Sequence, residues 1–115
     1  MRILTFDQFE FDNPSSEERL EVSLASRGEF PFPTPTSFVA ACVGTDAAGR
    51  IGPAVRFSER FGYGKVREYL SHFAAVALPE NCSWPCYVLA DGPDEWQIVI
   101  ETPDQFICYC WSTSA

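Results

Sequence analysis

Residues 95–111, which decide the fold, read EWQIVIE, then TPD, then QFICYCW. Apolar residues dominate the two flanking stretches, and Thr102-Pro103-Asp104 between them is a tight-turn sequence. Because a short turn makes its flanking strands antiparallel neighbours, this segment predicts a β-hairpin. The second stretch is apolar at both parities, so we expect a strand that is covered on both faces. Its two parities are Phe106, Cys108 and Cys110 on one side, and Ile107, Tyr109 and Trp111 on the other.

Directly before this hairpin, Cys86–Ala90 predicts a further strand. The turn sequence Asp91-Gly92-Pro93-Asp94 joins it to the hairpin. These three strands form a predicted meander. At the other end of the sequence, residues 2–11 and the alternating segment 20–25 predict a second hairpin. Its apolar phase slips near Asp7-Gln8, which indicates a bulge or two short strands.

The middle of the chain is more ambiguous. Ser37–Val43 and Ile51–Ser58 are apolar segments on either side of a glycine-containing loop, and we interpret them as another hairpin. A helix through residues 38–48 is the competing interpretation, because that stretch is rich in alanine. Alternate prolines in residues 30–35 predict an extended connector, since proline fixes φ and removes a backbone donor.

One helix is clearly predicted, over Lys65–Leu78. Apolar residues recur there at spacings of three and four, which gives one apolar stripe, and Pro79 is expected to end the helix. The chain therefore predicts an α+β fold, with a curved antiparallel sheet in the order ββββ-α-βββ packed on one main helix. We expect a single domain over residues 1–115, because its length is that of one ordinary domain.

Composition narrows the classes of function. The formal net charge is −8, and acidic surfaces repel the phosphates of nucleic acid. No apolar run approaches the length of a membrane span, and the start lacks the pattern of a signal peptide. Five cysteines without dense, regular spacing favour a reducing compartment, so we expect a cytoplasmic protein.

The charge is unevenly distributed along the chain. Residues 1–24 carry a net charge of −4, residues 25–79 carry +2, and residues 80–115 carry −6 without any base. Arg67 is the last basic residue. If the two acidic ends pair in one sheet, their carboxylates share a surface with a strongly negative potential, which attracts and steers basic partners.

Residues with catalytic or metal-binding chemistry have ordinary structural interpretations. Cys82, Cys86, Cys108 and Cys110 could supply four thiolates to zinc, but their spacing is not that of a zinc knuckle, and buried structural thiols are common. His72 is expected to be a surface histidine four residues after Glu68. The glycines of 62-GYGK-65 are expected to let the chain turn into the helix, although a helix start can also hold an anion. We therefore expect no catalytic residue, no metal and no cofactor.

The acidic, tryptophan-rich and tyrosine-rich last third is where we expect binding. Tryptophan and tyrosine are favoured interface anchors, and surrounding acids set orientation and association rate. The predicted partner-binding residues are Asp91, Asp94, Glu95, Trp96, Glu101 and Asp104, with Glu17, Glu18 and Glu21 if the N-terminal hairpin lies alongside.

In size, charge and predicted architecture the chain is similar to immunity proteins, which neutralise toxins, and to phage-borne inhibitors of nucleic-acid-handling machinery. No motif matches one named family. We therefore expect a non-enzymatic inhibitor of a basic partner protein, of the immunity type, which acts as a monomer or small homo-oligomer. The alternatives are a phage-encoded inhibitor of defence machinery, a small-ligand-binding barrel or small enzyme, and a structural subunit of a larger assembly.

Overall fold

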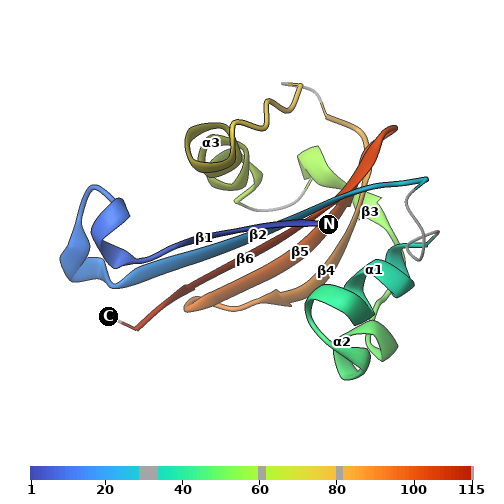
Figure 1. Ribbon diagram of the computed structural model, residues 1–115, viewed down its shortest axis with the longest axis horizontal. Helices are drawn as coiled ribbons and strands as arrows, with labels where there is room; N and C mark the ends of the chain where they lie inside the picture. Colours follow the sequence, from blue (N-terminus) through green and yellow to red (C-terminus); the bar gives the residue numbers. More distant parts are fainter. Residues whose placement is uncertain (29–33, 60–61, 80–81, 115) are drawn as a thin grey trace.

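The structure, a computed structural model, describes residues 1–28, 34–59, 62–79 and 82–114. It is an α+β fold in which an antiparallel sheet carries helices on both faces (Figure 1). The elements in chain order are β1 (Arg2–Phe6), the 3-10 turns η1 (Gln8–Glu10) and η2 (Pro14–Ser16), β2 (Glu18–Ser26), α1 (Pro35–Cys42), α2 (Thr45–Gly49), β3 (Val55–Arg56), η3 (Phe57–Glu59), α3 (Tyr63–Ala74), β4 (Pro85–Asp91), β5 (Glu95–Glu101) and β6 (Gln105–Thr113).

The sheet has six strands in the order β1-β2-β6-β5-β4-β3, and every neighbouring pair is antiparallel. The hairpins predicted over residues 2–25 and 95–111 and the meander of the last three strands are confirmed. The centre of the sheet is the long pairing of β2 with β6, which runs from Glu18 opposite Thr113 to Ser26 opposite Gln105. The two acidic ends of the sequence therefore lie side by side, which meets the condition that we set for a shared negative surface.

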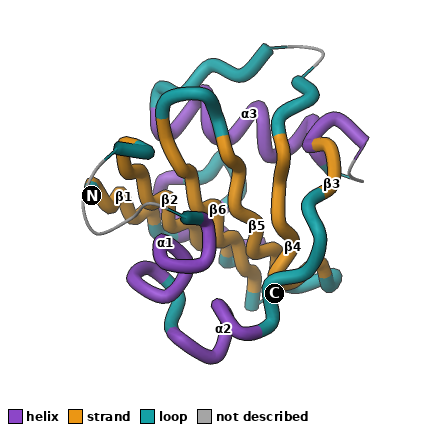
Figure 2. Tube along the Cα trace, turned by 90° about the vertical axis from the view of Figure 1, so that its right-hand side faces the viewer, coloured by secondary structure: helices purple, strands orange, loops and turns teal. Residues whose placement is uncertain are grey.

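Strand β6 is covered on both faces, as its apolar residues at both parities predict. Ile107, Tyr109 and Trp111 pack in a core with α3, whereas Phe106 and Cys108 pack in a second core with α1 and α2. Figure 2 shows α3 on one side of the sheet and the two short helices on the other. Phe38 of α1 stacks on Phe106 with ring centroids 5.5 Å apart.

Helix α3 confirms the predicted apolar stripe, since Val66, Leu70 and Ala74 are buried. The helix ends earlier than we expected from Pro79. Ala75 adopts a left-handed conformation with φ of 56°, and its N–H caps the helix on the carbonyl of Leu70. A left-handed residue of this kind is a common helix terminator, although it is usually glycine. His72 is exposed, as predicted.

The predicted hairpin over residues 37–58 is wrong, and the competing helical interpretation is closer. Thr34 caps α1 reciprocally with Ser37, and Pro35 occupies the first turn, where its missing N–H costs nothing. Gly44, at φ of 128°, separates α1 from α2. Only Val55–Arg56 of the expected second strand pairs, and its partner is β4. Most of the proline-rich segment, residues 30–33, lies outside the described residues.

The order is thus ββ-αα-β-α-βββ rather than ββββ-α-βββ, and the sheet packs on helices at both faces rather than on one main helix. The phase slip near Asp7 has a local cause. Asp7 caps the 3-10 turn η1 through its side chain, which accepts from the N–H of Phe9, so β1 stops at Phe6 and the chain turns away from the sheet. No helix among the described residues is long and apolar enough to cross a membrane.

Candidate functional site

Acidic residues from both ends of the sequence gather at one end of the sheet, the end on the left of Figure 1. The register places Glu18 opposite Thr113, and the N–H of Thr113 donates to the carbonyl of Asp94 at 2.9 Å. The loop after β1, the start of β2, the β4–β5 turn and the end of β6 therefore meet there. We call this the acidic end. Its carboxylates belong to Asp7, Glu10, Glu17, Glu18, Glu21, Asp91, Asp94 and Glu95.

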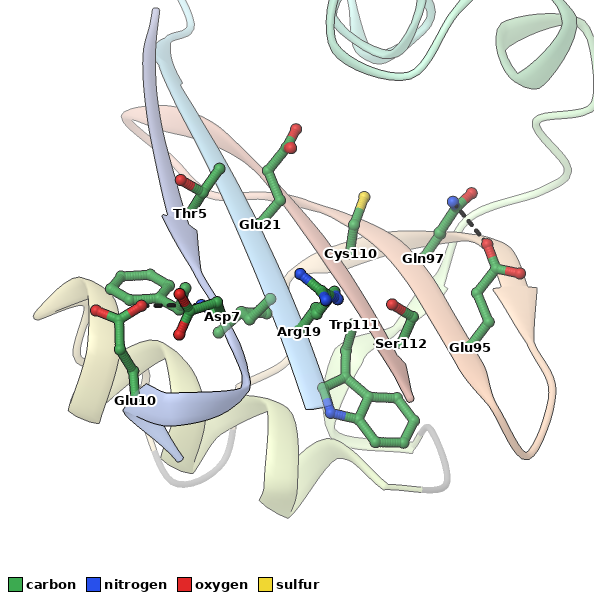
Figure 3. Close-up of a pocket in the computed structure, with 12 residues that line it drawn as sticks. Thr5, Asp7, Glu10, Arg19, Glu21, Glu95, Gln97, Cys110, Trp111 and Ser112 are labelled. Atoms are coloured by element: carbon green, nitrogen blue, oxygen red, sulfur yellow. Dashed lines mark hydrogen bonds between the residues drawn. The ribbon is translucent and has the colours of Figure 1, made fainter. Parts of the chain in front are cut away.

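A groove of about 510 Å³ lies across the sheet at the acidic end. Helices α1 and α2 cover only the other half of this face, so the groove has side chains of β1, β2, β6 and β5 as its floor (Figure 3). Thr5, Glu21, Cys110 and Gln97 form one cross-strand row in it. Asp7, Glu10 and Glu95 add three more carboxylates to the lining.

Arg19 is the only base among the residues that line the groove. It lies opposite Ser112 of β6 and forms no ion pair with the part of the chain that the structure describes. Four carboxylates around one guanidinium leave the groove with an excess of negative charge. A concave surface of one sign focuses its field and raises the local concentration of counter-ions.

Glu18 is a largely buried carboxylate of the acidic end, with a side chain 13% exposed. Its Oε1 accepts from the hydroxyl of Tyr69 at 2.8 Å and from the indole N–H of Trp111 at 2.9 Å. Its Oε2 accepts from the hydroxyl of Ser16, and Lys65 Nζ lies 3.5 Å from Oε1. Burial raises the pKa of Glu18, but these hydrogen bonds and the charge of Lys65 together outweigh burial and lower it.

The contacts of Glu18 indicate a structural role. It faces α3 and joins β2, β6 and the helix, so its charge is already matched by four polar groups of the chain. The same network, together with burial, raises the pKa of Tyr69, whose neutral phenol remains a hydrogen-bond donor to the carboxylate. Glu18 is therefore a supporting residue of the acidic end rather than one of its open carboxylates.

The structure separates the nine predicted binding residues into two groups. Seven lie at the acidic end: Glu17, Glu18, Glu21, Asp91, Asp94, Glu95 and Trp96. Glu101 and Asp104 lie at the opposite end of the sheet, beside the β5–β6 turn. There Arg27 Nη2 lies 2.7 Å from Glu101 Oε2, and the hydroxyl of Tyr87 donates to Glu101 Oε1. Glu101 is thus paired and is remote from the groove.

The seven are further divided between the two faces of the sheet. Glu21 and Glu95 belong to the groove face. Asp91 lies opposite Trp96 on the α3 face, and Trp96 is half-buried there against Gly62. A cavity of about 490 Å³ adjoins this tryptophan. Its lining residues are Gly62, Lys65, Val66, Asp91, Gly92, Pro93, Trp96, Tyr109 and Trp111. Lys65 Nζ lies 4.0 Å from the ring centroid of Trp111.

Sequence reasoning missed three of the charged residues that line the groove, Asp7, Glu10 and Arg19. The net charge of −4 on residues 1–24, to which Asp7 and Glu10 contribute, was the only sequence signal that could have indicated these two residues as part of the site. Their position depends on η1, whose capping turn folds the chain back at the end of β1. Arg19 was unremarkable as one of two bases in the acidic segment 1–24, and only the strand register places it beside the groove.

The cysteines do not form the four-thiol set that the sequence raised as an alternative. Cys82 and Cys86 are buried in the core under α3, whereas Cys108 belongs to the core under α1 and α2. The sheet therefore separates the two pairs. Among the described residues, no group of three or more histidine, cysteine or acidic side chains is arranged to hold a metal ion.

A scan against protein-family models and searches of the curated proteins and of the solved structures found no match to this chain. The residues and their arrangement are thus the basis for a functional proposal.

Proposed function

We propose that this chain is a non-enzymatic protein that binds a basic site on another protein and inhibits it, in the manner of an immunity protein that neutralises a toxin such as a nuclease. The observation that carries the proposal is the convergence of acids from both ends of the sequence on one open groove. Glu21, Glu95, Asp7 and Glu10 line it together with a single base.

The chemistry of the partner follows from this charge. A nuclease must present lysine and arginine to phosphate groups, and these same side chains would pair with carboxylates at the groove. Charge complementarity accelerates association and excludes acidic competitors. The exposed Asp94 and Glu95 lie at a hairpin tip, where they could enter a cleft that normally holds a phosphate backbone.

The groove supports protein binding better than catalysis. Its carboxylates Asp7, Glu10 and Glu95 are exposed. General acid–base catalysis needs a carboxyl group in a partly dry cleft with a shifted pKa. The most perturbed acid at this end, Glu18, has a lowered pKa and faces the interior of the protein.

The proposal is tested by capture from extract of the native cell at low ionic strength, with the purified chain immobilised. We expect recovery of one predominantly basic protein that salt releases, and inhibition of that protein's activity when the purified chain is added back. Recovery of no basic protein, or binding that salt does not weaken, would count against the proposal, since a pairing between exposed charges is screened by salt.

A small-ligand-binding protein is the second candidate, and the cavity beside Trp96 favours it. Its volume of about 490 Å³ lies in the range of small-molecule sites, and its walls combine aromatic rings with Lys65 and Asp91. A thermal-shift screen with metabolites distinguishes the two candidates, because a ligand that binds only the native state raises the melting temperature.

A further inference from the structure

Three of the five cysteines meet where α1 reaches the sheet. Cys42 is the last residue of α1, and Cys108 and Cys110 share one face of β6. The sulfur atoms of Cys108 and Cys110 lie 3.7 Å apart, and Cys108 is also hydrogen-bonded to Cys42. Cys108 therefore lies between two other thiols. All three are free cysteines in the structure.

The three thiols differ in exposure. Cys108 is buried, with 1% of its surface exposed, whereas Cys42 and Cys110 are partly accessible. Cys110 also lines the groove in the same row as Glu21, and its sulfur projects from the groove face of the sheet (Figure 3). A small solute can thus approach the cluster from the two outer thiols, while the central thiol is shielded.

The hydrogen bond from Cys108 is the largest influence on Cys42 and lowers the pKa of that thiol. Burial of Cys42 and the negative charge of Glu21 both oppose this shift and do not cancel it. The pKa of Cys108 is raised well above its ordinary value, because Cys108 is hydrogen-bonded with Cys110 and with Cys42 and is itself buried. Cys42 therefore forms a thiolate more readily than Cys108 does, and the thiolate is the reactive nucleophile.

We propose that Cys42, Cys108 and Cys110 form an oxidation site at which a hydroperoxide converts the Cys42 and Cys108 thiols into a disulfide that joins α1 to β6. The inference does not depend on the proposed partner. It assigns to Cys42 the role of the attacking thiol and to Cys108 that of the resolving thiol.

The chemistry takes place in two steps. The Cys42 thiolate attacks the terminal peroxide oxygen, the O–O bond breaks, and Cys42 becomes a sulfenic acid; the leaving group is hydroxide from hydrogen peroxide or an alkoxide from an organic hydroperoxide. The Cys108 sulfur then attacks the Cys42 sulfur, the S–O bond breaks, and the thiol proton of Cys108 leaves with the hydroxyl group as water. Overall, two thiols supply two electrons that reduce one hydroperoxide, and one disulfide forms.

Strand geometry explains why Cys108 pairs with Cys42 rather than with Cys110. Alternate residues on one strand have Cα atoms about 6.8 Å apart and parallel Cβ directions. This separation is at the upper limit for a disulfide, which also requires the two Cβ atoms to approach each other. Cys42 reaches Cys108 from a separate element that packs on the sheet, so the two side chains can face each other.

The experiment uses the reduced full chain treated with equimolar hydrogen peroxide and then alkylated with iodoacetamide. Peptides are mapped without reduction by mass spectrometry. Because Arg67 is the last basic residue, trypsin leaves four cysteines on one peptide, whereas chymotrypsin separates Cys108 from Cys110 by cleavage after Tyr109. We expect one disulfide between Cys42 and Cys108, with Cys82 and Cys86 alkylated as free thiols.

Three variants define the roles. In Cys108→Ser, dimedone should trap a sulfenic acid on Cys42, because no resolving thiol is present. Cys42→Ser should abolish the disulfide, and since Cys42 is a partly exposed residue at a helix end, this variant is expected to fold. Cys82→Ser is the matched control, because Cys82 lies on the other face of the sheet, and it should leave the disulfide unchanged.

A second measurement does not require any variant. At neutral pH, Cys42 of the native protein should react with iodoacetamide about tenfold faster than Cys82, because the pKa of Cys42 is lowered and its thiol is partly exposed, whereas Cys82 is buried. The proposal is overturned if peroxide leaves Cys42 free, if the same disulfide yield persists in Cys42→Ser, or if oxidation gives only disulfides between chains.

Discussion

The indole N–H of Trp111 donates to Oε1 of Glu18 across 2.9 Å, so a residue near the start of β2 accepts from one near the end of β6. The same oxygen accepts from Tyr69 of α3. One carboxylate therefore fixes the relative position of two strands and a helix at the acidic end.

Removal of the Glu18 carboxylate should destabilise the fold. In Glu18→Ala, the donors of Tyr69 and Trp111 lose their acceptor in a partly buried site, and we expect a loss of about 2–4 kcal/mol in the free energy of unfolding. Urea denaturation at neutral pH measures it. Glu68→Ala is the control, since Glu68 is exposed on α3, and its effect should stay within about 0.5 kcal/mol. Equal effects of the two variants would contradict the role of Glu18.

Glu18 should also contribute to the pH dependence of stability. Because its pKa in the folded protein is lowered from the ordinary 4.5, its stabilising contribution is complete above that pH and is lost as the pH falls through the folded value. The variant Glu18→Gln cannot ionise at this position. The stability difference between wild type and Glu18→Gln should therefore be constant near neutral pH and shrink below pH 4.5. A difference that widens on acidification would show that the sign is wrong.

Gly62 should be intolerant of a side chain. It precedes α3 at φ of 84°, and a Cβ there would lie 2.3 Å from the Trp96 ring. Gly62→Ala should cost at least about 2 kcal/mol, because a left-handed alanine is strained and the indole must move. Gly64→Ala is the matched control. Gly64 lies two residues further along the chain, and a Cβ added there has no atom within 4 Å. That variant should gain about 0.5–1 kcal/mol from the better helix propensity of alanine. Thermal denaturation measures both variants, and Trp96 fluorescence should shift only in Gly62→Ala.

Charge reversal at the groove should abolish capture of the proposed basic partner. The double variant Glu21→Lys/Glu95→Lys changes the local charge by +4 in total, counting both residues, and should weaken binding at least about tenfold by like-charge repulsion. Asp104→Lys is the control at the opposite end of the sheet and should bind as wild type does. Retention of full binding by the double variant would place the interface elsewhere.

Much of the sheet could be predicted from local patterns. The apolar residues at both parities of Phe106–Trp111 indicated a strand covered on both faces, and the short turn at Thr102–Asp104 indicated its antiparallel neighbour. The second pairing partner of that strand, β2, could not be deduced, because it depends on contacts between residues that are distant in the sequence. The helix α1 was misread for a different reason. Its short apolar stretch fits strand and helix equally, and the capping by Thr34 and Pro35 that decides between them follows a proline-rich segment.

The candidate site was predicted in part, and its error has a simple geometric source. Glu95 and Glu101 are the first and last residues of the same strand. The six steps of extended chain from one to the other span about 20 Å. The two residues therefore lie at opposite ends of the sheet and cannot share one compact surface. Glu95 therefore belongs to the groove and Glu101 to its ion pair with Arg27. Acids that are close in the sequence therefore lie at two opposite ends of the sheet.

The pairing of β2 with β6 also determines how this chain must fold. Residues 18–26 find their central partner only in residues 105–113, so the first hairpin cannot enter a complete sheet until the last hairpin has formed. Closing so long a loop costs entropy before the core compensates for it, and such nonlocal topologies fold slowly. During synthesis on the ribosome, the edge of β2 that pairs with β6 stays unpaired until β6 has been made. Until then, the apolar residues Leu20, Val22 and Leu24 of β2 can associate with other chains.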